Sequence, residues 1–353
     1  MRTYKHGGDV YSYDVEMDFS ANINPLGMPE SVKKAVQASI SDCIHYPDPY
    51  CRELTKGISQ KENVPEEYIL CGNGAADLIF RFVLAKRPKR ALILAPSFSE
   101  YEGALAVGEC QVSYYTLSNQ NGFRLTEDFI HQITEEIDTV VLCNPNNPTG
   151  RLIEPELLEK VAEQCQKTNT FLFLDECFLD FMEDGEQRSM KKKLAENSSL
   201  LILKAFTKMY GIPGLRLGYC LCSDKELIEK MRSASQSWAV SVPAQAAGIA
   251  ALAEKQFVQD TIKLIKQEQL YLLSELRSIG IPCYPPSANY IFFKEEQGIY
   301  ERLLKKGILI RSCHNYPGLE HGYFRIAIKS HQENEKLVQA IREVIKEGSI
   351  WQM

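Results

Sequence analysis

The sequence contains no apolar run that approaches the roughly 20 residues required by a membrane-spanning helix. Neither end carries a long basic run, and the formal net charge is -6; both features argue against a general nucleic-acid binder and against a membrane-surface anchor. The opening residues MRTYKHGGDVYSYD are polar and lack the apolar stretch of a secretory signal. We therefore expect a cytoplasmic protein that acts on a small molecule, with neither nucleic acid nor membrane as a partner.

The sequence also lacks any CxxC pair, although its 353 residues include 11 cysteines. Their number is odd and most lie inside apolar runs, as Cys143 does, which favours buried and reduced thiols over disulfides. Cys220 and Cys222 share one face of an expected strand, but neither a CxxC pair nor a histidine cluster stands near them, so ordinary burial is the better interpretation. We therefore assign no metal site.

Short apolar runs alternate with longer amphipathic segments through the middle of the chain. The runs predict strands at 91–96, 139–145, 170–176, 200–206 and 218–223. Their nearly continuous hydrophobicity is typical of parallel strands covered by helices on both faces. Helices are expected at 75–84, 154–167 and 224–238. This pattern predicts an α/β fold with a three-layer, mostly parallel sheet core.

The pattern changes from about residue 258 onward. A long amphipathic helix at 260–278 is followed by short strands and a short helix, and a closing helix begins at His331. The first 41 residues hold little sheet-forming material of their own. We therefore expect a large α/β domain at 42–257 and a smaller α+β domain built from both chain ends, 1–41 and 258–353.

Polar residues directly follow the expected strands, at the edge where open parallel sheets bind ligands. NPNNPTG (144–150) follows one strand and Asp175 follows the next. The glycine-rich turn GNGAAD precedes the helix at 75–84, so the N–H groups of Gly74, Ala75 and Ala76 can cradle a phosphate. These segments are expected to meet at one site.

The segment KAFTKMYGIPGLRLGY (204–219) follows the next strand and offers a hydroxyl, an amine and a guanidinium in Thr207, Lys208 and Arg216. These are the groups needed to hold a phosphate beside a lysine that forms a Schiff base. Lys204 is the rival amine. It is disfavoured because it still belongs to the strand and has no hydroxyl neighbour.

NPNNPTG, the aspartate of LDEC and the lysine of TKMYGIPGLR occur in an order that resembles the fold-type I pyridoxal-phosphate enzymes of the aspartate-aminotransferase superfamily. The resemblance covers nearly the whole chain. It implies the type I fold of pyridoxal-phosphate-dependent transferases, pyridoxal 5'-phosphate as cofactor, and a homodimer.

The same resemblance implies a role for each matching residue. Lys208 and Asp175 would be catalytic, the lysine binding the cofactor covalently and the aspartate pairing with the pyridine nitrogen. The ring and phosphate contacts would come from Gly74, Ala75, Ala76, Phe98, Asn147, Phe178, Thr207 and Arg216, and from Tyr46 of a partner subunit. Two positions depart from the family pattern: many relatives carry a hydroxyl at Ala205 and a tyrosine at Phe178.

Two subfamilies compete for the reaction. HGGD (6–9), DFSANINPLGMP (18–29) and ILIRSCHNYPGLEHGYFRIAIKS (308–330) resemble the threonine-phosphate decarboxylases of cobalamin synthesis. These enzymes convert L-threonine O-3-phosphate to (R)-1-amino-2-propanol phosphate and carbon dioxide. Histidinol-phosphate aminotransferases tend to carry a tyrosine at Leu26, so Leu26 favours the decarboxylase, with an aminotransferase as the alternative.

The decarboxylase resemblance implies a second group of site residues. The substrate phosphate would be bound by His6, Asn24 and Arg311, and the substrate carboxylate by Arg325. Two other classes of protein fit less well. A transcription regulator would need a basic helix-turn-helix, and no such segment is expected before the α/β core. A Rossmann dehydrogenase would need a glycine spacing that GNGAAD lacks.

Overall fold

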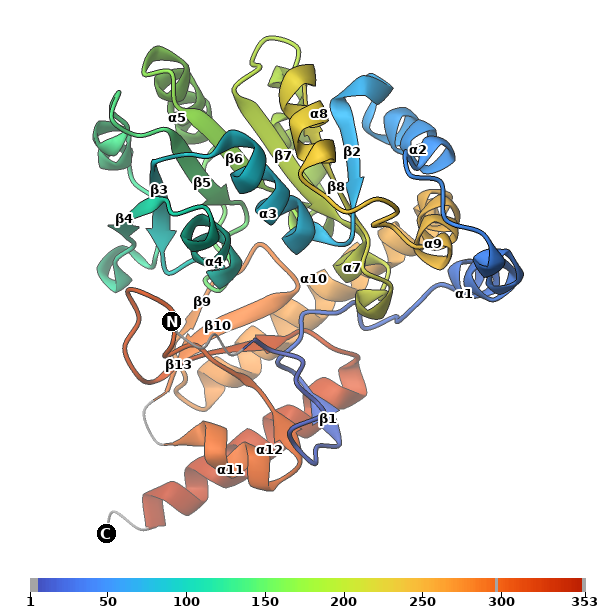
Figure 1. The fold of residues 1–353 in the computed structure, drawn as a ribbon. Coiled ribbons are helices and arrows are strands. Elements are labelled where there is room, and N and C mark those ends of the chain that lie inside the picture. The colour runs from blue at the N-terminus through green and yellow to red at the C-terminus, as the bar shows by residue number, and fades with distance from the viewer. Residues whose placement is uncertain (1–5, 296–297, 351–353) are drawn as a thin grey trace.

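The computed structural model describes residues 6–295 and 298–350. Its large sheet has seven strands in the order β2-β8-β7-β6-β5-β3-β4 (Figure 1). The strands are β2 (Ile69–Gly72), β3 (Arg90–Ala95), β4 (Gln111–Thr116), β5 (Thr139–Cys143), β6 (Phe171–Asp175), β7 (Leu200–Ala205) and β8 (Gly218–Cys222). The five strands from β4 to β7 run parallel, whereas β8 is antiparallel to both β7 and β2.

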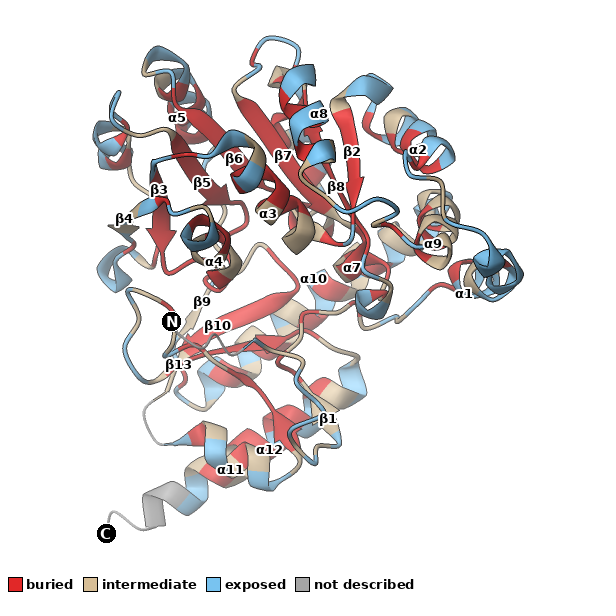
Figure 2. Ribbon diagram, viewed as in Figure 1, coloured by how far each residue is buried: buried red, intermediate tan, exposed pale blue. Residues whose placement is uncertain are grey.

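Helices cover both faces of this sheet, and each face has its own apolar cluster. One face packs on α3 (Ala75–Lys86), α4 (Ser99–Val107) and α8 (Lys225–Ser233). The other packs on α2 (Arg52–Glu62), α5 (Pro155–Lys167) and α9 (Val242–Leu252). In Figure 2 the strands of the large sheet other than β4 are mostly buried, and the helices turn their exposed sides outward. The three-layer, mostly parallel α/β core is confirmed.

Some expected elements differ from the structure. β8 is antiparallel because the chain returns from β7 through a loop and not through a long crossover helix. β2 and β4 were not expected; β4 is largely exposed, so its sequence QVSYYT shows no apolar run. The helix expected at 224–238 ends at Ser233, and the helix expected from 260 begins at Lys255 as α10 (Lys255–Ser278).

The smaller lobe contains a four-stranded antiparallel sheet in the order β12-β13-β10-β9. Its strands are β9 (Cys283–Tyr284), β10 (Tyr290–Lys294), β12 (Arg311–Ser312) and β13 (Tyr323–Ala327). Helices α10, α11 (Ile299–Lys305) and α12 (His331–Ile350) pack against this lobe. Figure 1 shows that it lies beyond the carboxyl ends of β3, β5 and β6.

The amino-terminal segment contacts both parts of the molecule. β1 (Met17–Asp18) pairs with β11 (Ile308–Leu309) in the smaller lobe, whereas α1 (Glu30–Ser39) packs against α9. The division into domains 42–257 and 1–41 with 258–353 stays a prediction. Among the described residues, no helix combines the length and the apolar character needed to cross a bilayer.

Candidate active site

A cavity of about 430 Å³ lies between the large sheet and the smaller lobe, and both parts of the molecule line it. The large sheet contributes the residues that follow its parallel strands, where their carboxyl ends form one edge. The chain ends contribute Tyr316, Arg325 and residues of the first turns of the chain. Segments from opposite ends of the chain therefore meet at this cavity: Ser20 and Arg325, which both line it, are 305 positions apart.

Lys208 lines the cavity from α7 (Phe206–Met209), directly after β7. Desolvation, together with the positive charges of Arg325 and Arg216, lowers the pKa of its amine to about 8. An amine with such a pKa is largely neutral at slightly alkaline pH and is then nucleophilic. Lys204, the rival amine, does not line the cavity and is paired with Asp180 at 2.7 Å from Nζ to Oδ1.

Asp175 ends β6 and turns its carboxylate into the same cavity. The hydroxyl of Tyr101 donates to Oδ2 at 2.5 Å, and the backbone N–H of Cys177 donates to Oδ1 at 2.9 Å. Burial raises the pKa of this carboxyl, while both hydrogen bonds and the charge of Lys208 act in the opposite direction. Asp175 is thus rigidly held and needs a cationic partner in the cavity.

A cradle of N–H groups and a guanidinium closes one end of the cavity. Gly74 caps α3 with φ 84° and ψ 168°, and Ala75 and Ala76 line the cavity from the first turn of that helix. Thr207 on α7 and Arg216, farther along the same segment between β7 and β8, also line the cavity. A Cβ atom at Gly74 would lie 2.6 Å from Nη2 of Arg216, so only glycine lets the backbone approach the guanidinium this closely. This end of the cavity suits an anion.

Arg325 occupies the opposite wall, on β13. Its Nη1 donates to Oδ1 of Asn147 and its Nη2 donates to the carbonyl of Ser20 at 2.8 Å. Its Nε is buried and has no partner among the described residues. The guanidinium also lies 5.3 Å from the centre of the Tyr290 ring. The side chain is held firmly but keeps hydrogen-bonding capacity.

Two phenylalanines complete the walls of the cavity. The Phe98 ring meets Tyr101 edge to face with centroids 5.6 Å apart, and the Phe178 ring meets Tyr290 in the same way at 5.1 Å. Tyr101 donates a hydrogen bond to Asp175. Phe98 packs on Tyr101, so it helps to hold Tyr101, and through it the Asp175 carboxylate, in place. A planar ligand between Lys208 and Asp175 would therefore be flanked by apolar surface.

A second and larger cavity of about 1240 Å³ adjoins the first, and the two share His6, Gly7 and Ser20. Arg311 lines the larger cavity from β12. Its Nη2 donates to Oδ1 of Asn315 at 2.9 Å, whereas its Nε is buried without a partner among the described residues. His6 stands at the junction with its Nε2 2.9 Å from Oε1 of Glu100. Arg311 is in register with Arg325 on the neighbouring strand, so two guanidinium groups lie on adjacent strands at this junction.

The structure does not bring Asn24 to either cavity, contrary to the expectation from the sequence. The Nδ2 of Asn24 donates to the carbonyl of Met209 at 2.6 Å and to the hydroxyl of Thr261 at 2.7 Å, and its Oδ1 accepts from the N–H of Leu26. Asn24 therefore anchors the turn, and its side chain is buried and lines neither cavity.

Asn22, two positions earlier, was not expected and lines the smaller cavity. Its Oδ1 is buried and has no partner among the described residues. The sequence ANIN (21–24) contains two asparagines two positions apart. Nothing in the sequence says which of them contacts a ligand, and only their tertiary contacts distinguish them. Tyr101 and Glu100 were also missed, although both follow Phe98 closely in the sequence APSFSEY (95–101).

Tyr46 lies outside both cavities of this chain. Its side chain is 77% exposed and stacks on Trp238 with ring centroids 4.3 Å apart. Its expected contribution to a partner subunit's site stays a prediction. Apart from Tyr46 and Gly74, all the residues expected at the cofactor line the smaller cavity. Gly74 does not line it but lies next to the guanidinium of Arg216, which does.

Comparisons with known proteins agree with this geometry. Residues 14–341 match the family model described as aminotransferase class I and II. The chain is 39% identical to the threonine-phosphate decarboxylase of Salmonella typhimurium, with 96% of each chain covered. The structure of the histidinol-phosphate aminotransferase from Clostridium acetobutylicum superposes with a TM-score of 0.88 at 30% identity, covering 94% of this chain and 99% of that one. The structure of the L-threonine-O-3-phosphate decarboxylase from Porphyromonas gingivalis superposes with a TM-score of 0.80 at 25% identity, covering 93% and 99%.

Proposed function

The chain belongs to the aminotransferase class I and II family, and from this membership we propose that it is a pyridoxal-phosphate-dependent lyase that decarboxylates L-threonine O-3-phosphate. The observation that carries the proposal is the 39% identity to a threonine-phosphate decarboxylase over 96% of both chains. The products would be (R)-1-amino-2-propanol phosphate and carbon dioxide, in the synthesis of cobalamin.

The residues of the smaller cavity fit pyridoxal phosphate. A buried carboxylate, an amine of lowered pKa and a guanidinium beside a helix amino terminus are the three groups that its ring nitrogen, aldehyde and phosphate need. When bound, this cofactor supplies an electron sink for a bond broken at the substrate's Cα. The rest of the chemistry belongs to the side chains around it.

Lys208 would bind the cofactor covalently and, once released by the substrate amine, hold or deliver a proton at Cα. Asp175 would keep the ring nitrogen protonated, since a nearby anion favours the charged form of a base. Asn147 and Phe178 would lie beside the ring oxygen, and Phe98 would stack on the ring. Gly74, Ala75, Ala76, Thr207 and Arg216 would bind its phosphate.

Arg325 would bind the substrate carboxylate, and its unpartnered Nε supports this role. Arg311 and His6 would bind the substrate phosphate in the adjoining cavity. A substrate held at both ends can rotate little, so these arginines would decide which Cα bond stands perpendicular to the cofactor ring and breaks. Asn22 replaces Asn24 as the asparagine proposed to contact the substrate, because its Oδ1 is buried at the cavity without a partner.

A histidinol-phosphate aminotransferase is the second candidate, favoured by the TM-score of 0.88 with such an enzyme. Its substrate would use the same cofactor contacts and the same cationic residues. Leu26 favours the decarboxylase, as does the higher identity of 39% against 30%. We also propose a homodimer in the cytoplasm, in which Tyr46 reaches the cofactor phosphate of the partner subunit.

The test mixes the cofactor-loaded protein with L-threonine O-3-phosphate in the absence of an oxo acid and follows carbon dioxide over many turnovers. Sustained release is the expected result. No release, combined with amino transfer from histidinol phosphate to 2-oxoglutarate, would replace the decarboxylase with the aminotransferase.

A matched pair of substrates tests the phosphate site. Arg311→Ala should lower kcat/KM for L-threonine O-3-phosphate roughly 10- to 150-fold, because a hydrogen bond to a charged group is worth about 1.5–3 kcal/mol. Its effect on L-threonine, which has no phosphate, should be small. An equal loss of kcat/KM on both substrates would show that Arg311 does not bind the substrate phosphate.

A further inference from the structure

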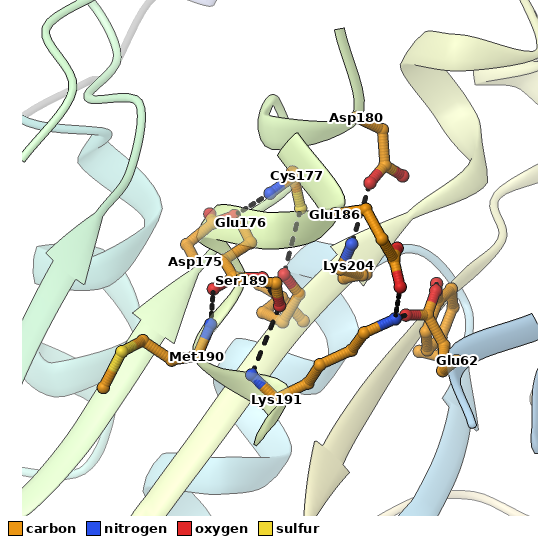
Figure 3. Close-up of polar contacts among 12 residues, drawn as sticks. Glu62, Asp175, Glu176, Cys177, Asp180, Glu186, Ser189, Met190, Lys191 and Lys204 are labelled. Atoms are coloured by element: carbon orange, nitrogen blue, oxygen red, sulfur yellow. Dashed lines mark hydrogen bonds and ion pairs between the residues drawn. The ribbon is translucent and has the colours of Figure 1, made fainter. Parts of the chain in front are cut away.

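A cluster of charged side chains lies outside both cavities; its Lys204, Lys191 and Glu62 are buried, Asp180 is partly buried, and Glu186 is exposed at its edge. Figure 3 shows its two lysines, Lys204 and Lys191, directed at Asp180, Glu186 and Glu62. Lys204 Nζ lies 2.7 Å from Oδ1 of Asp180, and Lys191 Nζ lies 2.8 Å from Oε2 of Glu62. The function proposed above uses none of these groups.

Three further contacts tie the cluster to the sheet and to the segment after β6. Tyr219 on β8 donates to Oε1 of Glu62 at 2.5 Å. Glu176, which directly follows Asp175, accepts from the hydroxyl of Ser189 at 2.6 Å and from the N–H of Met190 at 3.0 Å. The segment that begins at Asp175 therefore presents one carboxylate to the cavity and the next to the charged cluster.

The Lys204–Asp180 pair is charged on both sides. Although burial opposes protonation, the negative charges of Asp180, Glu62 and Glu176 raise the pKa of Lys204. Although burial opposes ionisation, the charge of Lys204 lowers the pKa of Asp180. The Lys204 side chain is 2% exposed and the Asp180 side chain 26% exposed, so this ion pair is less screened by solvent than a pair of fully exposed side chains.

The pair joins the two segments that carry Asp175 and Lys208. β6 and β7 run parallel, with Asp175 in register with Leu203, and the N–H of Glu176 donates to the carbonyl of Leu203 at 2.9 Å. After this hydrogen bond the two segments form different elements: the one after β6 leads into η5 (Leu179–Phe181), and the one after β7 leads into α7. Lys204, four positions before Lys208, reaches across to Asp180, five positions after Asp175.

We propose that Lys204 and Asp180 are positioning residues, which hold the Asp175 carboxylate and the Lys208 amine at the separation that the cofactor ring requires. The proposal rests on the function proposed above, because it assigns Asp175 and Lys208 to opposite ends of that ring. Neither residue of the pair touches the cavity contents: Lys204 and Asp180 are absent from its lining.

An ion pair suits this task better than an apolar contact. Replacing a buried ion pair with apolar residues is often neutral or even stabilising, so the pair is not needed for stability as such. A hydrogen-bonded lysine and carboxylate instead demand a defined distance and direction. Losing either partner removes the hydrogen bond that joins the two segments, and losing both leaves the segments joined only by an apolar contact.

Four variants separate positioning from stability. Lys204→Met breaks the pair, and the double variant Lys204→Met with Asp180→Leu removes both charges and keeps an apolar contact. Lys204→Arg retains the charge and the hydrogen bond. Lys191→Met is the matched control, because it removes a neighbouring buried charge whose side chain pairs with Glu62 and Glu186 and not with Lys204 or Asp180.

Visible circular dichroism of the bound cofactor reports the orientation of its ring without any turnover. Lys204→Met and the double variant should change this band, weaken pyridoxal phosphate binding at least tenfold and lower kcat at least tenfold. The KM of the substrate should change little, since Arg311 and Arg325 lie on the smaller lobe. Lys204→Arg should restore most of the band, and Lys191→Met should lower the unfolding temperature with an unchanged band.

Two results would overturn the proposal. One is a double variant with the dichroism, cofactor affinity and kcat of the unaltered protein. The other is an equal change of the band in Lys191→Met, which would make the effect one of general stability. If Lys204→Met does not fold, the double variant and Lys204→Arg still decide between the alternatives. A failed decarboxylase reaction leaves the dichroism test intact, because that test needs only bound pyridoxal phosphate.

Discussion

Replacing Gly74 with alanine should weaken cofactor binding much more than the backbone change alone would explain. Gly74 has φ 84° and ψ 168°, a region that only glycine adopts readily; an alanine there costs about 1–3 kcal/mol of stability. The new Cβ would stand 2.6 Å from Nη2 and 3.0 Å from Cζ of Arg216. Because these atoms end a flexible side chain, the guanidinium would move away and the fold would survive.

The expected loss of affinity for pyridoxal phosphate follows from the displacement of the Arg216 guanidinium. If Arg216 donates to the cofactor phosphate, its loss removes hydrogen bonds to a charged group, worth about 1.5–3 kcal/mol. That corresponds to an increase of roughly 10- to 150-fold in the Kd of pyridoxal phosphate. Pyridoxal, which has no phosphate, should bind the altered and unaltered proteins with similar affinity.

Equilibrium titration of the cofactor-free protein, followed by absorbance, measures both affinities. Gly280→Ala is the control, because Gly280 also has a positive φ of 81° but no heavy atom within 4 Å of the added Cβ. It should lower the unfolding temperature and leave cofactor affinity unchanged. The reasoning fails if Gly74→Ala binds pyridoxal phosphate normally, or if Gly280→Ala weakens binding as much.

The remaining predictions concern Lys208 and Asp175. Lys208→Ala should abolish the fixation of cofactor by borohydride reduction, whereas Lys204→Met should retain it; peptide mass mapping after reduction would reveal the opposite assignment. Asp175→Asn should keep bound cofactor but lower kcat by orders of magnitude, because a neutral amide no longer favours a protonated ring nitrogen; steady-state turnover close to that of the unaltered protein would contradict the role of Asp175. The rate at which the cofactor-free protein binds pyridoxal phosphate covalently should rise with pH around a midpoint near 8, since the pKa of Lys208 is about 8 and only the neutral amine reacts; a stopped-flow profile still rising at pH 10 would rule this out.

Both the parallel core and the cofactor side of the site follow from local patterns. Strands such as 139–143 and 200–205 are short apolar runs, which a sheet buried on both faces requires whatever surrounds it. Asn147, Asp175 and Lys208 follow such strands directly, so the parallel arrangement alone carries them to one edge. Their meeting in one cavity could therefore be predicted before any contact was known.

The local sequence did not predict strand β4 or the direction of strand β8. β4 is an edge strand with mostly exposed residues; QVSYYT is rich in strand-forming residues but has no apolar run. The direction of β8 depends on the loop after Lys208, which returns without the long crossover helix that a parallel strand would need. In both cases the neighbouring strand, and not the local residues, determines the element.

The sequence by itself determined the fold class, the parallel core and the residues at its edge, because these depend on local hydrophobic pattern and on short spacings. Only the tertiary structure decided which asparagine of ANIN faces the cavity, since Asn24 is held by Met209 and Thr261, far along the chain, while Asn22 is not. It alone also brought Glu62, Asp180 and Lys204 into one charged cluster. Contacts between residues so distant in sequence arise from packing of the whole chain, and no local pattern encodes them.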